Sequence, residues 1–237
     1  MSHSLTIVVP VYNERENLQR LCNELLIFIE QSTMDTTVLF VNDGSTDGSL
    51  EKLRELCYGT SMLNYISFDK NYGLSTALTA GFDFAESSLI GYMDADLQTH
   101  PMDFNLLLPF VQEYELVTGW RTTRKDSLIK KMSSNIANGI RRSFTHDGIQ
   151  DTGCPLKIIH AKYAKRIPMF RGLHRFLPAM VLLQKGKVKQ IPVSHYPRIA
   201  GKAKFGLRNR LLGPLMDCFA FLWMKKKYIT YNVTSRG

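Results

Sequence analysis

Short β-branched runs alternate with amphipathic stretches between residues 5 and 93, and this alternation limits the possible folds more than any other feature of the chain. A short apolar run bounded by turn residues is typical of a strand buried in a parallel sheet. Apolar residues at steps of three and four indicate helices that cover such a sheet. We expect strands at residues 5–9, 37–41, 63–68 and 89–93, and helices at 14–30, around 50–56 and at 73–85. The sequence therefore predicts a Rossmann-like α/β fold, with a mostly parallel sheet and helices on both faces.

The alternation of strand and helix patterns is less regular in the second half of the chain. Residues 130–144 favour a helix, 151–155 a turn and 187–193 a strand with alternating character. No linker or second core is apparent. We expect a main domain over residues 1–210 and a basic C-terminal elaboration, an amphipathic helix and tail, over residues 211–237.

Charge is distributed unevenly along the chain, whose formal net charge is +9. Up to Trp120 there are 5 Lys or Arg against 17 Asp or Glu, and from Arg121 onward there are 25 against 4. An acidic half can hold a cation, whereas a basic half favours a polyanion such as nucleic acid, anionic lipid or a phosphorylated substrate. Solvated lysines on helix faces explain part of this excess but not the asymmetry.

Residues 211–224 form the most apolar stretch, but Gly213, Pro214 and Asp217 interrupt it. It is shorter than the roughly 18 residues that a membrane span needs. Because Lys225–Lys227 follow Trp223 directly, the stretch resembles a helix that lies on anionic lipid. A helix docked on the domain fits the pattern equally well.

Four cysteines without a C-x-x-C pair, and an opening without a secretory signal, favour a reducing, cytoplasmic setting.

Two carboxylates directly follow the last predicted strand of the first half, as Asp94 and Asp96. Strand ends are where ligands collect in such a sheet, and alternation would point both side chains the same way. Like charges so close repel each other unless a cation lies between them, and Mg²⁺ or Mn²⁺ suits such oxygen ligands. Gln98 could add a neutral oxygen. An isolated D-x-D string is more often a surface turn. The predicted metal site therefore rests on the position of Asp94 and Asp96 at the end of a buried strand.

Asp43 ends the second predicted strand and could accept hydrogen bonds from a base or ribose. Ser45, Thr46 and Asp47 could instead serve only to cap the next helix. Neither G-x-x-x-x-G-K-[ST] nor G-x-G-x-x-G is present in the sequence. Metal and basic side chains would therefore have to hold any diphosphate.

Taken in order, these motifs resemble family 2 inverting glycosyltransferases of the GT-A fold, over residues 5–206. The greatest resemblance is to the dolichol-phosphate mannosyltransferase-like, polyprenyl-phosphate branch. The motifs are VVPVYNE at 8–14, VNDGSTD at 41–47, NYGL at 71–74, YMDADLQ at 92–98, GWR at 119–121 and RIAGKAK at 198–204. Asn42, Trp120 and Ala203 depart from the usual pattern, but each motif keeps its charged member.

This resemblance implies a role for each matching residue. Asp96 and Arg121 would be catalytic, and Asp94, Asp96 and Gln98 would hold the metal. The nucleotide sugar would be bound by Pro10, Tyr12, Glu14, Asp43, Asp94, Arg198, Lys202 and Lys204. Arg121, Lys130 and Ser134 would bind the acceptor phosphate, although Lys130 replaces an expected arginine and loses its bidentate geometry. His174, Arg175 and His195 resemble a bacterial subgroup, and a core or supporting role is favoured for both histidines.

The basic half also bears on the acceptor. A sugar hydroxyl normally needs a carboxylate or histidine base, and after Arg121 the only acids are Asp126, Asp147, Asp151 and Asp217. A phosphate monoester is already anionic at neutral pH and needs cations to hold it. Asp151 is the one acid that could act as a base, with turn capping as an equal alternative.

We therefore expect a metal-dependent transferase that moves a hexose from a nucleotide sugar, of the GDP-mannose or UDP-glucose type, to a polyprenyl phosphate. It would act in the cytoplasm, peripherally at the inner face of an anionic membrane, and could form a homo-oligomer. Transfer to a glycan hydroxyl is the alternative within enzymes. A non-catalytic nucleic-acid-binding domain is the alternative outside them, but it leaves the acidic strand ends unexplained and we expect no nucleic-acid partner.

Overall fold

The computed structural model describes residues 3–122, 139, 141–197, 212–229 and 234–235. In this part of the chain seven strands form one sheet in the order β3-β2-β1-β4-β6-β5-β7. Neighbouring strands are parallel except at β6, which runs antiparallel to both β4 and β5. The mostly parallel α/β sheet predicted from the sequence is confirmed.

The elements alternate through the first half as expected, and most bounds differ from the predicted ones by one or two residues. The strands are β1 Ser4–Val11, β2 Asp35–Asn42, β3 Leu63–Ser67, β4 Leu89–Tyr92, β5 Leu116–Arg121, β6 Lys157–His160 and β7 Val188–Val193. The helices are α1 Arg15–Gln31, α2 Ser49–Cys57, α3 Leu74–Phe84, α4 Phe104–Leu107, α6 Ala161–Ala164, α7 Leu177–Leu183 and α8 Leu212–Lys227. Short 3-10 turns lie at η1 Pro101–Asp103, η2 Leu108–Phe110 and η3 Leu173–Phe176.

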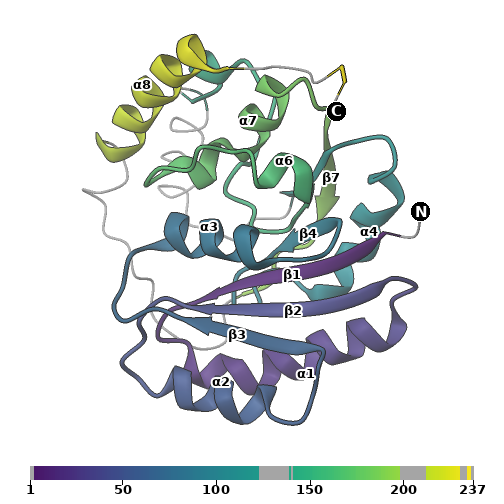
Figure 1. Ribbon diagram of the computed structural model, residues 1–237. Helices are drawn as coiled ribbons and strands as arrows, with labels where there is room; N and C mark the ends of the chain where they lie inside the picture. The colour runs from purple at the N-terminus through teal and green to yellow at the C-terminus, as the bar shows by residue number, and fades with distance from the viewer. Residues whose placement is uncertain (1–2, 123–138, 140, 198–211, 230–233, 236–237) are drawn as a thin grey trace.

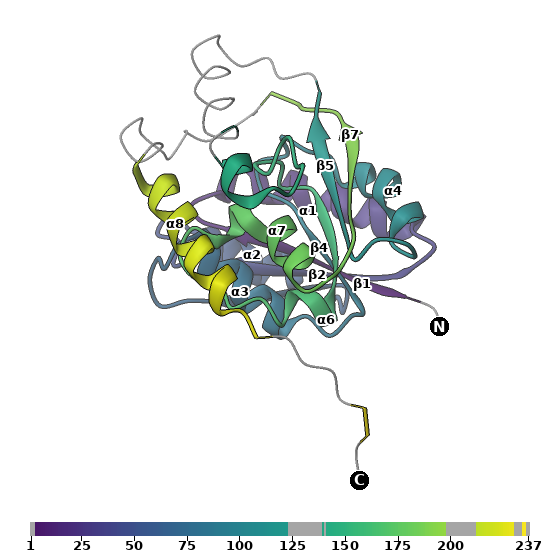
Figure 2. The ribbon, with the colours of Figure 1, turned by 90° about the horizontal axis from the view of Figure 1, so that it is seen from above.

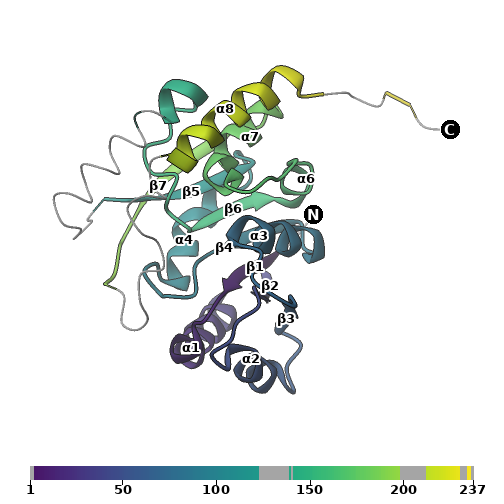
Figure 3. The same cartoon turned by 90° about the vertical axis from the view of Figure 1, so that its left-hand side faces the viewer.

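Two hydrophobic cores cover the two faces of the sheet. Leu5, Ile7 and Val9 of β1 belong to the core shared with α1 and α4, whereas Val8 belongs to the core shared with α3, η3 and α7. This split follows the two-residue period of a strand, and it explains why β1 is apolar at nearly every position. Figures 1 and 3 show α1 and α2 on one side of the strands and α3, α7 and α8 on the other.

Strands β5, β6 and α7 were not predicted from the sequence. Strand β6 has only four residues and begins with a lysine, so it lacks the apolar run of the earlier strands. Helix α7 is buried from Leu177 through Val181, so it has no polar face to produce a helical period. Figure 2 shows β5 beside β7, the pairing that the register confirms from Leu116 opposite Val188 to Arg121 opposite Val193.

Helix α8 is docked on the domain through one face and exposed on the other. Phe221 stacks on Phe176 of η3 with ring centroids 5.3 Å apart, and Arg175 Nη1 lies 3.2 Å from Asp217 Oδ2. On the outer face Met216 and Trp223 are 67% and 68% exposed. The helix is therefore docked on the domain through one face, and contact of its other face with lipid stays a prediction. Among the described residues, no helix has the length and apolarity to cross a membrane.

Candidate active site

The loops that follow β1 and β2 are joined by hydrogen bonds at the carboxyl edge of the sheet. Asn13 N donates to Ser45 Oγ (2.9 Å), and Asn13 Oδ1 accepts from Thr46 N (2.7 Å). Asn13 adopts a left-handed φ of 50°, a conformation that asparagine tolerates better than most residues. Asp47 Oδ2 accepts from Arg15 N (3.1 Å). The polar residues after β2 therefore fix the loop after β1 as well as the start of α2.

Three of the predicted nucleotide-binding residues lie in or beside this first loop. Pro10 is the residue before the last in β1 and pairs with Val41 of β2. Tyr12 and Glu14 follow the strand, and all three residues are half-buried. Glu14 Oε2 accepts from Asn17 Nδ2 (2.7 Å). The structure brings the three residues to the edge where the sequence placed them, and their role toward a nucleotide stays a prediction.

Asp43 binds the backbone of the segment that precedes α3. Its Oδ1 accepts from Tyr72 N (2.7 Å), and its Oδ2 accepts from Gly73 N and Asn71 Nδ2 (both 2.9 Å). Burial raises the pKa of Asp43, although the two backbone N–H groups counteract it. Asp43 thus connects the motif at residues 41–47 with the motif at residues 71–74. Its position at a strand end did not predict this structural role.

Asp94 and Asp96 emerge from β4 into a tight turn. Tyr92 Oη donates to Asp94 Oδ1 (2.8 Å), and Gln98 N donates to Asp96 Oδ1 (3.1 Å). Burial, followed by the charge of Asp96, raises the pKa of Asp94 to about 6. Leu97 has a φ of 54°, a conformation that costs a branched residue energy and is concentrated at functional turns.

The chemistry of this turn fits a divalent cation. A cation near the two carboxylates would relieve the repulsion that raises the pKa of Asp94. Among the described residues no cluster of three or more His, Cys, Asp or Glu could hold a metal ion. The protein would therefore supply Asp94, Asp96 and the Gln98 amide, and a substrate diphosphate would supply further oxygens, as is usual for Mg²⁺.

Arg121, at the end of β5, forms a bidentate ion pair with Asp151. Arg121 Nε lies 2.7 Å from Asp151 Oδ2, Nη2 lies 2.9 Å from Oδ1, and the backbone N also donates to Oδ2. The two side chains are only 10% and 6% exposed. Burial lowers the pKa of Arg121, but the bonds to Asp151 outweigh it and the net pKa is raised. Asp151 therefore orients the guanidinium that the sequence assigned to the acceptor.

Lys157, at the start of β6, lies within the candidate site and was not predicted from the sequence. Its Nζ donates to the carbonyls of Thr152 and Cys154 and lies 5.7 Å from the ring centroid of Tyr92. Burial lowers the pKa of Lys157, and the charges of Asp151 and Asp94 counteract that effect. This buried cation connects the turn that carries Asp151 with the tyrosine that holds Asp94. No motif in the sequence predicts that Lys157 is buried, because a lone lysine before two apolar residues usually lies at the surface.

The remaining predicted ligands, Lys130, Ser134, Arg198, Lys202 and Lys204, lie outside the described residues. Among the described residues nearest to Arg198, Tyr196 is held beside the turn that carries Asp96, because its backbone N donates to Gln98 O (3.0 Å).

His174 joins two elements behind the site. Its Nδ1 lies 2.8 Å from Ser75 Oγ, which also accepts from Gly172 N (2.9 Å). Burial, then the positive charge of Arg175, lowers the pKa of His174 to about 3, so the ring is neutral at physiological pH. These contacts connect α3 with η3 and agree with the supporting role favoured for this histidine.

Comparison with known proteins was consistent with this geometry. The sequence matches the profile of glycosyl transferase family 2 over residues 6–168. It is 30% identical over 231 residues to dodecaprenyl-phosphate galacturonate synthase of Rhizobium johnstonii, covering 95% of this chain and 68% of the relative. It is 29% identical over 218 residues to undecaprenyl-phosphate 4-deoxy-4-formamido-L-arabinose transferase of Edwardsiella ictaluri, covering 90% and 67%.

A solved structure confirms the architecture. Glucosyl-3-phosphoglycerate synthase from Mycobacterium tuberculosis, in complex with Mn²⁺, uridine diphosphate and glucosyl-3-phosphoglycerate, matches with a TM-score of 0.73 and 12% identity, covering 94% of this chain and 80% of that one. At this identity the likeness establishes the GT-A fold alone. Together with the family match over most of the sheet, it leads to the conclusion that this chain is a glycosyltransferase enzyme and belongs to glycosyl transferase family 2.

Proposed function

We propose that this enzyme moves a sugar from a nucleotide sugar to a polyprenyl phosphate with the help of Mg²⁺ or Mn²⁺. The names of the two relatives support the acceptor, because both describe transfer or synthesis on a prenyl phosphate. The Mn²⁺ and uridine diphosphate of the solved structure support the metal and a nucleotide donor. The sugar would be carried by UDP or GDP.

One observation carries the proposal: an acidic pair and a buried cationic pair meet at the same edge of the sheet. The charge of Asp94 acts on both Arg121 and Lys157, so the three groups belong to one electrostatic cluster. Carboxylates suit the metal and the donor diphosphate, whereas arginine suits a phosphate acceptor. The bonds to Asp151 occupy Nε and Nη2 of Arg121, and Nη1 has no hydrogen bond to any described residue. That edge of the guanidinium is available to an acceptor phosphate.

The reaction then needs little proton transfer. An oxygen of the acceptor phosphate attacks the anomeric carbon while the bond from that carbon to the diphosphate breaks, and the bonding electrons leave with the diphosphate. When bound, Mg²⁺ or Mn²⁺ neutralises the charge that develops on this leaving group. Arg121 holds the acceptor anion, and Asp151 keeps Arg121 oriented. Because a phosphate monoester has a second pKa near 6, no protein base has to activate it.

The alternative, transfer to a hydroxyl, would require a base beside the acceptor. Asp151 accepts three hydrogen bonds from Arg121, so its carboxylate oxygens are occupied in orienting the guanidinium rather than directed at an acceptor hydroxyl. The four cysteines are free thiols, which supports the cytoplasmic setting that we propose for the reaction, at the inner face of a membrane.

The test is a transfer assay with the purified 237-residue chain, Mn²⁺, and either UDP-glucose or GDP-mannose as first donors in a wider panel of nucleotide sugars. Three acceptors are compared: a short polyprenyl phosphate, the matching polyprenol without phosphate, and a soluble glycan. We expect product only with the phosphate, and none from Asp96→Asn, which should keep the far-ultraviolet circular dichroism of the wild type. Transfer to the polyprenol or the glycan, with the polyprenyl phosphate ignored, would replace this proposal with the hydroxyl alternative.

A further inference from the structure

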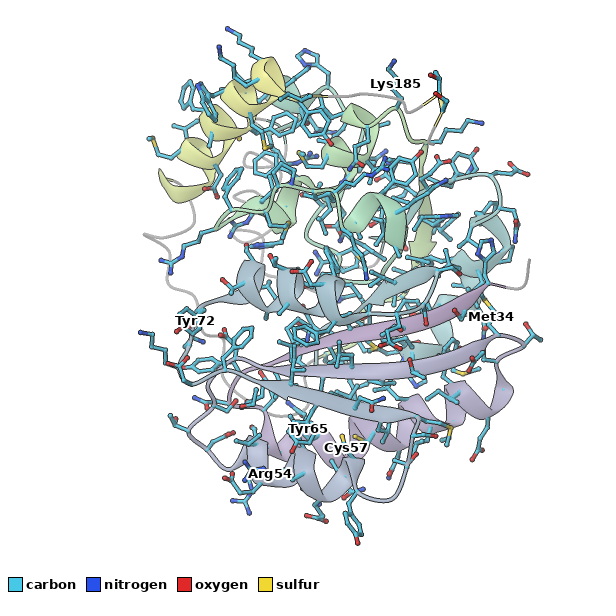
Figure 4. All side chains as sticks on the ribbon, viewed as in Figure 1. Met34, Arg54, Cys57, Tyr65, Tyr72 and Lys185 are labelled. Carbon is cyan, nitrogen blue, oxygen red and sulfur yellow. The ribbon has the colours of Figure 1, made fainter. Side chains whose placement is uncertain are left out.

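A cavity of about 810 Å³ lies between α6, the end of α7 and the end of α8, away from the active site. Helix α6 follows His160 of β6, which is paired with Leu89 at the amino end of β4. The candidate active site is at the carboxyl end of β4. The cavity therefore lies toward the opposite edge of the sheet and serves no step proposed above. Figure 4 shows Lys185, one of its lining residues, at the outer surface of this region.

The lining of the cavity combines positive charge with apolar and aromatic surface. Lys162, Arg166, Lys185 and Lys227 contribute four cations, and no acid lines the cavity. All four side chains are exposed, and none is in an ion pair with an acid of the described ranges. The apolar part of the lining includes Trp223, Met224, Tyr163, Pro168 and Ile229. This combination suits a ligand with an anionic group next to a hydrocarbon part.

Lys185 occupies a position where glycine would be the ordinary residue. It ends α7 with a φ of 63°, and the bonds Lys185 N to Leu182 O (2.9 Å) and Gly186 N to Val181 O (3.0 Å) form a Schellman motif. Glycine is favoured there because a side chain is strained in the left-handed conformation. The Schellman turn therefore holds Lys185 in a conformation that costs energy, with its side chain at the edge of the cavity.

The cavity is continuous with the exposed face of α8. Met216, Phe219 and Trp223 are spaced by three and four residues, which places them on one face of the helix, and all three are more than half exposed. Trp223 belongs both to this stripe and to the cavity lining. Lys225 to Lys227 continue the helix after it. An apolar stripe that ends in lysines is typical of a helix lying in the interface of an anionic bilayer.

We propose that the α8 stripe and the adjoining cavity form a membrane-binding surface, in which the cavity takes the phosphate headgroup of an anionic phospholipid. The cations would bind the headgroup, and Met216, Phe219 and Trp223 would enter the region between headgroups and acyl chains. The layer of α1 and α2, on the far side of the sheet, would face away from the bilayer (Figure 3). Binding at this surface needs neither the donor nor the sugar acceptor of the proposed reaction.

Vesicle binding by the full-length chain tests this surface. We would measure co-sedimentation with vesicles of phosphatidylglycerol and phosphatidylcholine, and with phosphatidylcholine alone, at physiological salt. The variant Lys162→Gln/Lys185→Gln removes two cavity cations, and its matched control Arg20→Gln/Arg54→Gln removes two exposed cations from α1 and α2. Since each lysine at an anionic surface contributes about 1 kcal/mol, the cavity variant should bind the anionic vesicles about 25-fold more weakly. The control should bind as the wild type does, because α1 and α2 lie across the sheet from the proposed surface and salt screens charges over such separations (Figure 3).

Two further variants separate the cavity from general charge and from misfolding. Lys185→Gly should raise the melting temperature by relieving the strained backbone, and should still weaken binding. Trp223→Ala should weaken binding, whereas Tyr58→Ala, an exposed aromatic on the α2 side, should not. Equal loss in the cavity and control variants would overturn the proposal, as would wild-type binding by Lys162→Gln/Lys185→Gln. Saturable binding of inorganic phosphate without any binding to anionic vesicles would assign the cavity to a soluble anion and overturn the lipid assignment.

Discussion

The pair Arg121–Asp151 offers the sharpest test of the site, because its structural and catalytic roles can be separated. The two side chains are almost fully buried and are joined by two side-chain hydrogen bonds of 2.7 and 2.9 Å. Removing one partner of such a pair leaves a buried charge unpaired and costs about 3–5 kcal/mol. For a chain of this length, 3 kcal/mol corresponds to a fall in melting temperature of roughly 6–12 °C. Arg121→Met should show this loss in full.

Asp151→Asn should be milder in both respects. The asparagine Oδ1 can still accept one hydrogen bond from Arg121, so we expect partial stability and partial activity toward polyprenyl phosphate. Arg121→Met should lose most activity through a raised acceptor KM, with donor binding kept. The double variant Arg121→Met/Asp151→Leu replaces both charges by apolar side chains of similar volume, an exchange that is often neutral for stability. It should recover most of the melting temperature and none of the activity.

A second buried pair provides the control. Arg141 and Asp147 are bonded to each other with side chains 6% and 0% exposed, and neither was assigned to the site. The double variant Arg141→Met/Asp147→Leu should behave as the first double variant does in thermal unfolding but should keep activity. Melting temperatures come from differential scanning fluorimetry, and acceptor KM from the transfer assay. Recovery of activity together with stability in Arg121→Met/Asp151→Leu would refute an acceptor role for Arg121.

Three other changes have defined outcomes. Because the pKa of Asp94 is raised from 3.8 to about 6, its ionisation destabilises the metal-free chain as pH rises through this range, by about 3 kcal/mol at pH 7. Asp94→Asn should therefore raise the melting temperature of the metal-free chain at pH 7 but not near pH 4. It should also weaken Mn²⁺ binding measured by calorimetry. An unchanged melting temperature at pH 7 would contradict the raised pKa of Asp94. Lys157→Met leaves two buried carbonyls without their donor, so we expect about 2 kcal/mol less stability and a higher acceptor KM with unchanged donor affinity; an equal loss of donor affinity would argue against its link to Asp151. Asp43→Asn removes a charged acceptor from two backbone N–H groups and should weaken nucleotide binding about tenfold in equilibrium titration, and wild-type affinity would disprove its role there.

The acidic part of the candidate site could be predicted because its residues follow strands that the hydrophobic pattern makes evident. Asp43 and Asp94 both follow an apolar strand, and parallel strands bring their carboxyl ends to one edge. Gly44 has a structural explanation, since its φ is 64° and an added Cβ would lie 2.2 Å from the backbone of Lys70. The strand-end signals are local in sequence, whereas the contact of Gly44 with Lys70 is a tertiary one.

The cationic part could not be predicted in the same way. The partners Arg121 and Asp151 are 30 residues apart, and only the register of β5 against β6 brings them together. Lys157 is buried at the start of a four-residue strand, where the sequence alone favours an exposed lysine. The insertion of β6 between β4 and β5, antiparallel to both, brings Asp151 to Arg121 and buries Lys157. No hydrophobic period in the sequence predicts this insertion.

From Arg121 onward 25 Lys or Arg stand against only 4 acids, so pairing within this half can neutralise only a few of its cations. Among the described residues, three of these acids are each bonded to an arginine: Asp151 to Arg121, Asp147 to Arg141 and Asp217 to Arg175. The fourth, Asp126, lies outside the described residues. These three acids fix individual guanidinium groups, so they are poorly placed either to neutralise the surface cations or to act as a base. A phosphate acceptor and an anionic membrane surface are the two partners that such an arrangement favours.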